Sequence, residues 1–269
     1  MQGLRDVHLR DLHLPRSRAL PRVRRELGKR SVKRKLVLFD IDGTLLLSAG
    51  AGRRAIHAAV TDYLASAHHG TGAGRAPQTI RFDGKTDPQI VIELLAAAGY
   101  DTAEAGRVQA VLDHYVAHLE RDLAANGHRA YLMPGVPALL DALEADDGTV
   151  LGLLTGNVRR GAQLKLRAVG IDPARFRVGA FGCDHPDRPR LPPIAAERAE
   201  PIFGRRPDGC DVVIVGDTPA DVWCAGSIGA RTVAVATGSY RMDELHAAGA
   251  DRVFADFTDT ARALEAMLS

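Results

Sequence analysis

The feature that most constrains the fold is a short apolar run that ends in two closely spaced carboxylates. Residues 36–39 read Leu-Val-Leu-Phe, and Asp40 and Asp42 follow with one apolar residue between them. A continuous apolar run of this length is typical of a strand buried on both faces of a parallel sheet. The run therefore predicts a buried strand that carries Asp40 at its carboxyl end. Alone, the pattern also fits a strand end closed by a side-chain turn.

Apolar runs and helical patterns alternate along the second half of the chain. This alternation predicts an α/β fold, a Rossmann-like parallel sheet with helices on both faces. Residues 183–193 are rich in proline and charge, which predicts a loop. The expected strands are 149–154, 177–180, 211–215 and 231–236, and the expected helices are 134–146, 158–169, 194–203, 219–228, 241–248 and 259–268.

A helical, strand-poor insertion follows the first strand. Hydrophobic periodicity predicts helices at 50–67, from Asp87 to about residue 98, and at 102–125. Asp87-Pro88 is a helix start, in which we expect the Asp87 side chain to cap the helix and proline to occupy its first turn. Glycines predict a flexible connection within 68–77. We therefore expect an all-helical domain at 49–130 and an α/β core formed by 35–48 and 131–269.

The charge of the chain is unevenly placed. Residues 1–35 contain twelve Lys or Arg and three acids, so the remaining 234 residues carry 23 basic and 30 acidic side chains. The segment 1–34 is interpreted as a basic, poorly ordered extension. Attraction to nucleic acid or to an anionic membrane is a sharper alternative, but charge without a recognisable fold is weak evidence for it.

Three cysteines, Cys183, Cys210 and Cys224, show no CxxC spacing and cannot all pair. A reducing compartment is the simplest interpretation, and a zinc site is not expected. No apolar run approaches the roughly 18–20 residues of a membrane helix, and the N-terminus lacks the apolar segment of a secretory signal. We expect a cytoplasmic protein without a membrane partner. The sequence indicates no oligomeric state.

Polar groups follow three of the expected strands. Asp40 and Asp42 end the first, Thr155-Gly156-Asn157 follows residue 154, and Asp217 with Asp221 follows residue 215. Ligands of open parallel sheets bind beyond the carboxyl ends of the strands, so these groups are expected at one edge. Converging carboxylates repel by several kcal/mol, about 4 for a pair at 4 Å and an effective dielectric of 20, unless a cation intervenes. Hard oxygen ligands without His or Cys favour Mg²⁺.

Two further features suit a phosphate group. Thr155, Gly156 and Asn157 supply a hydroxyl and backbone N–H groups near a helix start, which is a fitting anion site. Lys165, ten residues later, can turn back over the same edge as a compensating cation. A solvent-exposed helical lysine is the plainer alternative.

These residues resemble the haloacid dehalogenase-like hydrolase superfamily, specifically its phosphatases. The resemblance covers roughly residues 36–256. Asp40-Ile41-Asp42-Gly43-Thr44-Leu45 is similar to the first motif, Leu153 to Asn157 to the second, and Gly216 to Asp221 to the fourth. The helical insertion resembles the helical cap of the family, and Phe82 to Asp87 resembles the cap segment of phosphoglycolate phosphatase-like members, which reaches the substrate.

The resemblance implies a magnesium-dependent phosphatase that hydrolyses a small phosphorylated metabolite through an aspartyl-phosphate. Asp40 would be the nucleophile, and Asp42 would move the proton and begin in its protonated form. Thr155 would hold the phosphoryl oxygens and Lys165 would be the third-motif cation, with Arg188, Arg190 or Arg198 as alternatives. Mg²⁺ would be held by the Asp40 carboxylate, the Asp42 carbonyl and Asp217, supported by Asp221. In the cap, Lys85 is the substrate candidate, with Arg53 and Asp87 also within the expected range.

Three other functions compete with this one. A dehalogenase would have no use for Asp42, because halide leaves without a proton. A phosphomutase would share nearly all the site residues and differ in how its cap excludes water. A binding protein whose basic tail recruits nucleic acid would need none of them.

Overall fold

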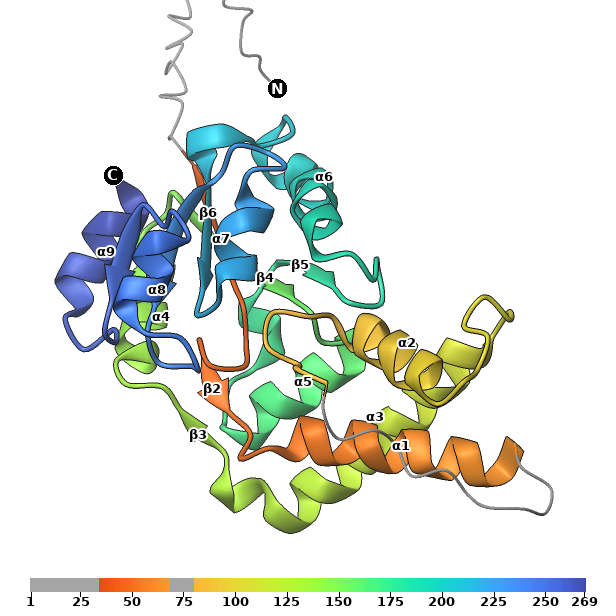
Figure 1. Cartoon of the computed structure of the whole chain (residues 1–269). Helices are drawn as coiled ribbons and strands as arrows, with labels where there is room; N and C mark the ends of the chain where they lie inside the picture. The colour runs from red at the N-terminus through yellow and green to blue at the C-terminus, as the bar shows by residue number, and fades with distance from the viewer. Residues whose placement is uncertain (1–33, 68–79) are drawn as a thin grey trace, which may run out of the picture. The chain divides into compact units, whose positions relative to one another are not determined.

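The computed structural model describes residues 34–67 and 80–269. The basic extension 1–34, apart from Arg34, and the connection expected at 68–77 lie outside the described residues. Within the described ranges the core is a six-stranded parallel sheet with strand order β5-β4-β1-β6-β7-β8 (Figure 1). The predicted α/β fold class is confirmed. The strands are β1 (Lys35–Phe39), β4 (Thr149–Thr155), β5 (Val178–Phe181), β6 (Val212–Gly216), β7 (Arg231–Val235) and β8 (Arg252–Phe254).

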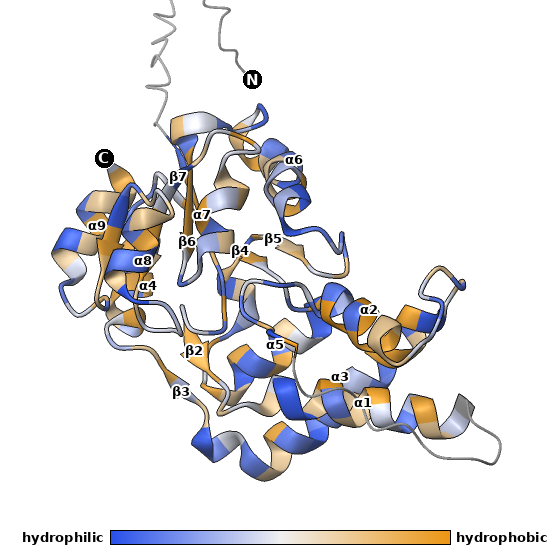
Figure 2. Ribbon diagram, in the orientation of Figure 1, coloured by the Kyte–Doolittle hydropathy of each residue, from blue (hydrophilic) through white to orange (hydrophobic). Residues whose placement is uncertain are grey.

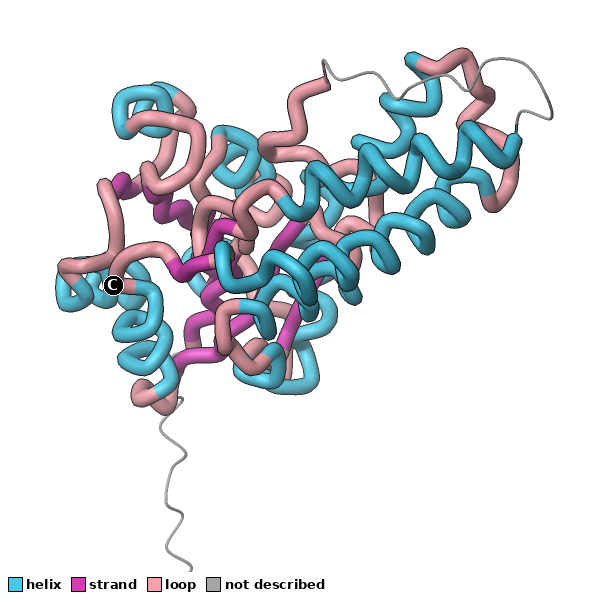
Figure 3. Tube along the Cα trace, turned by 90° about the horizontal axis from the view of Figure 1, so that it is seen from below, coloured by secondary structure: helices cyan, strands magenta, loops and turns pink. Residues whose placement is uncertain are grey.

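Side chains of the central strand β1 alternate between two hydrophobic clusters. Val37 and Phe39 pack into one cluster with α4, α5 and α9, whereas Leu36 and Leu38 pack into the other with α6 and α7. Helices therefore cover both faces of the sheet, as Figure 3 shows from below, and the visible strands β6 and β7 are coloured hydrophobic in Figure 2. The helices of the core are α4 (Val136–Glu144), α5 (Arg159–Ala168), α6 (Leu191–Phe203), α7 (Pro219–Ala225), α8 (Met242–Ala247) and α9 (Thr260–Leu268).

Three helices lie between the first strand and the rest of the core. They are α1 (Ala51–Ala67), α2 (Asp87–Ala97) and α3 (Arg107–Asn126), and they share a hydrophobic cluster of their own. A short antiparallel ladder of β2 (Leu46–Leu47) and β3 (Tyr131–Leu132) joins the entry and exit of this insertion. We call α1 to α3, with the segment Ile80–Thr86, the cap. That the cap at 49–130 is a separate domain stays a prediction.

The structure corrects two predicted helix starts. Helix α3 begins at Arg107 rather than at 102, because Gly106 before it has a left-handed φ of 82°. Helix α6 begins at Leu191 rather than at 194, inside the expected loop, since the two prolines that follow are compatible with the first turn of a helix. The short edge strand β8 was not predicted, because three residues give too little pattern.

The cap of helix α2 also differs from the prediction. Thr86, not Asp87, caps the helix, and its hydroxyl accepts a hydrogen bond from Gln89 N at 3.2 Å. Pro88 lies in the first turn as expected. The Asp87 carboxylate points to a different helix, described below.

Among the described residues, every helix is too short or too polar to span a bilayer.

Candidate active site

A cavity of about 200 Å³ lies beyond the carboxyl ends of β1, β4 and β6, between the core and the cap. Nearly all predicted site residues are brought together here. Thr155 and Asp221 are buried but do not line the cavity themselves. The predicted residues that line it are Asp40, Asp42, Gly156, Asn157, Lys165 and Asp217 from the core, and Arg53, Lys85 and Asp87 from the cap.

Three carboxylates form a buried cluster at one side of the cavity. Asp40 follows β1, Asp217 follows β6 and Asp221 lies in the first turn of α7; one oxygen of each lies within 4.8 Å of the others. Burial raises the pKa of Asp40 to about 6, and the charges of Asp221 and Asp42 add to burial while Arg188 opposes it. Burial, followed by the charges of Asp221 and Asp40, also raises the pKa of Asp217 well above its ordinary value.

The turn after β1 holds Asp217 in place. The Thr44 hydroxyl donates a hydrogen bond to Asp217 Oδ1 at 2.9 Å. Gly43 has a φ of 88°, and a Cβ there would lie 2.3 Å from Asp217 Oδ2, so only glycine fits. This contact could not be predicted from the sequence, because Asp217 lies far along the chain from Gly43 and Thr44.

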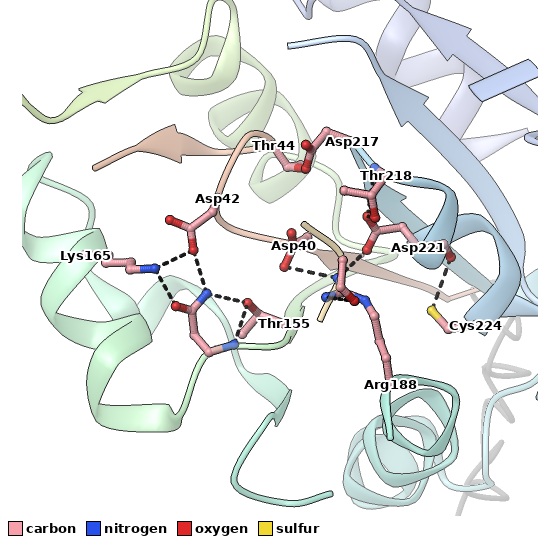
Figure 4. A network of polar contacts seen from close by, with 12 residues as sticks. Asp40, Asp42, Thr44, Thr155, Lys165, Arg188, Asp217, Thr218, Asp221 and Cys224 are labelled. Carbon is pink, nitrogen blue, oxygen red and sulfur yellow. Dashed lines mark hydrogen bonds and ion pairs between the residues drawn. The ribbon is translucent and has the colours of Figure 1, made fainter. Parts of the chain in front are cut away.

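Arg188 is the cation of this cluster. Its side chain is 5% exposed, Nη2 lies 3.2 Å from Asp40 Oδ1, and the same atom forms an ion pair with Asp221 (Figure 4). Arg190 is exposed and does not line the cavity, and Arg198 pairs with Asp184 instead. Of the three arginine alternatives, the structure therefore brings only Arg188 to the nucleophile position.

Asp42, Asn157 and Lys165 form a second polar network across the cavity (Figure 4). Lys165 Nζ donates to Asp42 Oδ2 and to Asn157 Oδ1, both at 2.6 Å, and Asn157 Nδ2 donates to Asp42 Oδ2 at 2.8 Å. Two donors on one oxygen suit the ionised carboxylate, so this arrangement does not favour the protonated Asp42 that we expected at the start of the reaction. The Thr155 hydroxyl accepts a bond from Asn157 Nδ2 at 2.8 Å.

The cap contributes two cations with different surroundings. Lys85 forms an ion pair with Glu93 on α2. Arg53 lies with its guanidinium carbon 4.1 Å from the centre of the Phe82 ring and has no acidic partner among the described residues. Both line the cavity, so either can face a ligand, but only Arg53 brings an uncompensated charge.

Comparison with known proteins agrees with this geometry. The model of the haloacid dehalogenase-like hydrolases matches residues 34–229. This chain belongs to the haloacid dehalogenase-like hydrolases. Phosphoglycolate phosphatase from Xylella fastidiosa is 32% identical over 87% of this chain and 87% of its own length, and that from Rhodospirillum rubrum is 30% identical over 83% and 88%. The fold is shared with a hydrolase from Pseudomonas syringae (23% identity, TM-score 0.61, 88% and 100% covered).

These findings confirm the predicted superfamily and enzyme class, a phosphatase. The roles of individual residues rest on the geometry described above.

The donor set of this haloacid dehalogenase-like phosphatase fits a divalent metal ion. Asp40, Asp217 and Asp221 offer three buried carboxylates, and Arg188 alone among the described cations contacts them. The raised pKa values of Asp40 and Asp217 show that their negative charge is under-compensated. A hard cation with oxygen ligands, such as Mg²⁺, matches this shortage of positive charge.

Replacing Asp217 by Asn tests the metal site by stability. Because the pKa of Asp217 is raised in the folded state, its ionisation destabilises the fold; this cost is absent below pH of about 4 and grows as pH rises. We expect metal-free Asp217→Asn to melt at a higher temperature than wild type at pH 8, by about 2–4 °C per kcal/mol relieved. Mg²⁺ should raise the melting temperature of wild type only. An equal rise in both proteins would contradict the assignment.

Proposed function

We propose that this protein is a magnesium-dependent phosphatase that hydrolyses a small phosphate monoester through an aspartyl-phosphate, with phosphoglycolate as the first substrate to test. The observation that carries the proposal is the position of Asp40. It is buried at the end of β1, beside the cation Arg188 and within the carboxylate cluster, and it lines the cavity. The relatives of this chain that are named phosphoglycolate phosphatase suggest the substrate.

In the first step, an oxygen of Asp40 attacks phosphorus and the bond from phosphorus to the leaving oxygen breaks. Asp42 gives its proton to the leaving oxygen. Since Asp42 is held as a carboxylate by Lys165 and Asn157, it must gain a proton before this step, and a bound phosphate monoester can supply one.

In the second step, water attacks phosphorus and the bond to Asp40 breaks. Asp42 accepts the proton of the water, which requires its ionised form, and the hydrogen bonds from Lys165 and Asn157 favour that form. Free phosphate and the alcohol are the products.

The metal ion would be held by Asp40, Asp217 and the Asp42 carbonyl, with Asp221 supporting them. When bound, it supplies positive charge that binds and orients the phosphoryl oxygens.

We propose that two residues, Arg188 and Lys165, share the role expected of the third-motif cation. Arg188 contacts Asp40, so it stabilises charge on the nucleophile, which is the role first expected of Lys165. Lys165 contacts Asp42 and Asn157, so it faces the phosphoryl group from the side of Thr155.

A reduced cytoplasm, as predicted from the cysteines, remains our expectation for where the enzyme acts.

The cavity also suits a substrate with a second anionic group. Arg53 has an uncompensated charge at the cap side, whereas Ile56 and Phe82 beside it are apolar. Ser48 and Asp83 also line the cavity and can bind a hydroxyl group, so the preference for an anionic group rests on the charge of Arg53. A short carboxylate such as that of phosphoglycolate is the better match.

Asp40→Asn tests the nucleophile. We expect turnover of phosphoglycolate with Mg²⁺ to fall by about 10³-fold or more, because the amide cannot form the covalent intermediate. Turnover is measured as the release of phosphate. Asp172→Asn is the control, since Asp172 is an exposed carboxylate that only caps a turn at Ala174 N. Unaltered turnover of Asp40→Asn would refute the mechanism, and formation of an isomer of a sugar phosphate instead of free phosphate would favour a phosphomutase.

Double-mutant cycles in urea unfolding test which cation serves which carboxylate. Arg188→Met should be less destabilising when Asp40 is Asn, with a coupling of about 0.5–3 kcal/mol, because the carboxylate that needs the cation is gone. Lys165→Met should couple in the same way to Asp42→Asn. Lys165→Met and Asp40→Asn should be additive. Strong coupling of Lys165 to Asp40 would restore the single-cation interpretation.

Arg53→Ala tests the second anionic group. We expect KM for phosphoglycolate to rise about tenfold or more, the worth of one charged hydrogen bond, while KM for ethyl phosphate changes little. Arg160→Ala is the matched control, since Arg160 is an exposed arginine that pairs with Glu120. Equal changes for both esters would contradict recognition of the carboxylate.

A further inference from the structure

A cap segment, Phe82 to Asp87, lies directly against the core. The Thr86 hydroxyl donates to Pro186 O at 2.6 Å, and Asp87 N donates to Gly156 O at 2.8 Å. Gly84 lies so close to α7 that a Cβ there would be 2.7 Å from Ala220 Cβ. The segment therefore contacts the core on both sides of the cavity.

The Asp87 carboxylate belongs to the cap but serves a helix of the core. Its Oδ2 accepts a hydrogen bond from Val158 N at 2.8 Å, at the start of α5. Val158, the residue that precedes α5, provides no side-chain cap of its own. Asp87 is 6% exposed, and burial raises its pKa to about 6 although Lys165 opposes the shift. A buried carboxylate that stabilises neither its own helix nor an ion pair in direct contact needs another explanation.

Helix α5 carries part of the active site. Asn157 immediately precedes its first residues, and Lys165 lies two turns further on. Lys165 Nζ reaches Asn157 Oδ1 and Asp42 Oδ2, so the orientation of α5 sets where the cation lies. A small rotation of its first turn would move both side chains relative to Asp42.

The start of α5 is packed mainly by the cap. Val158 is a member of the hydrophobic cluster of the cap, and Gly161 contacts Leu119 and Tyr115 of α3 closely enough that a Cβ would lie about 3.4–3.5 Å from their side chains. The buried Tyr115 hydroxyl lies beside the Asp87 carboxylate and interacts with it, so α3 supports this carboxylate as well. Two directional contacts join the cap to the start of this helix: the exposed ion pair of Arg160 with Glu120, and the buried hydrogen bond from Val158 N to Asp87.

We propose that Asp87 is a positioning residue: its carboxylate, presented by the cap, holds the start of α5 and thereby fixes Asn157 and Lys165 against Asp42. The inference rests on the function proposed above. On this proposal, the phosphate site is complete only while the segment Phe82 to Asp87 lies on the core. Asp87 also lines the cavity, and its role is one of positioning because its carboxylate is engaged by Val158 N.

A double-mutant cycle with kcat as the readout tests this role. Asp87→Ser shortens the side chain so that its remaining oxygen no longer reaches Val158 N, whereas Val158→Pro removes the N–H; Val158 has a φ of −64°, which proline adopts without strain. Each single variant should lower kcat about 10- to 100-fold with a smaller change in KM, as expected when catalytic groups are misplaced by about 1 Å. The double variant should be no worse than either single variant. Multiplying effects, or an unchanged kcat in Asp87→Ser, would overturn the proposal.

Two further variants separate positioning from folding. Asp87→Asn keeps a carbonyl acceptor and should retain most of kcat; a loss equal to that of Asp87→Ser would overturn the proposal, and this variant serves even where Asp87→Ser does not fold. Asp172→Ser removes the same kind of backbone-capping carboxylate from an exposed turn outside the cavity, and it should leave kcat unchanged.

Amide hydrogen exchange gives a reading that needs no turnover. Asp87→Ser should lose protection at Val158 while Asp87→Asn retains it; protection that is the same in wild type and Asp87→Ser would overturn the proposal. If wild type releases no phosphate from any ester, the proposed function fails, and the exchange result still decides whether Asp87 holds α5.

Discussion

The active site depends on an electrostatic imbalance: three buried carboxylates share one guanidinium. Asp40, Asp217 and Asp221 meet because separate elements end at one edge of the sheet, and burial makes their mutual repulsion strong. Arg188 relieves part of it. The remaining repulsion favours a further cation at this site, and the hydrophobic clusters on both faces of the sheet offset its cost to the fold.

The second network distributes charge differently. Asp42 accepts hydrogen bonds from Lys165 and from the Asn157 amide. Asp40 and Asp42 therefore have distinct environments although they are only two positions apart. Asp40 is set among other acids, whereas Asp42 is set among donors. This asymmetry is a physical basis for giving one the role of nucleophile and the other that of proton carrier.

Much of this could be predicted from the sequence, because it follows from local patterns. Apolar runs located the central strands, and the polar residues just after them marked the edge where the site lies. What local patterns cannot supply is the partner of a side chain across the fold. Asp87 looked like the cap of its own helix, yet it binds Val158, 71 positions away. Arg188 was one of three arginine candidates, two in the predicted loop at 183–193 and one in the predicted helix at 194–203, and only the tertiary structure shows that Arg188 is the one buried beside Asp40.

The position of β1 has a consequence for how the chain folds. This strand is made early but pairs with β4 and β6, whose residues follow more than a hundred positions later. Until they arrive, both of its edges and the apolar run Leu36 to Phe39 stay unpaired, which favours slow folding and exposes the nascent chain to aggregation. The helices inserted after β1 pack mainly against one another, so their hydrophobic cluster can form during this wait. Synthesis from the N-terminus therefore leaves the strand that carries Asp40 among the last to be completed.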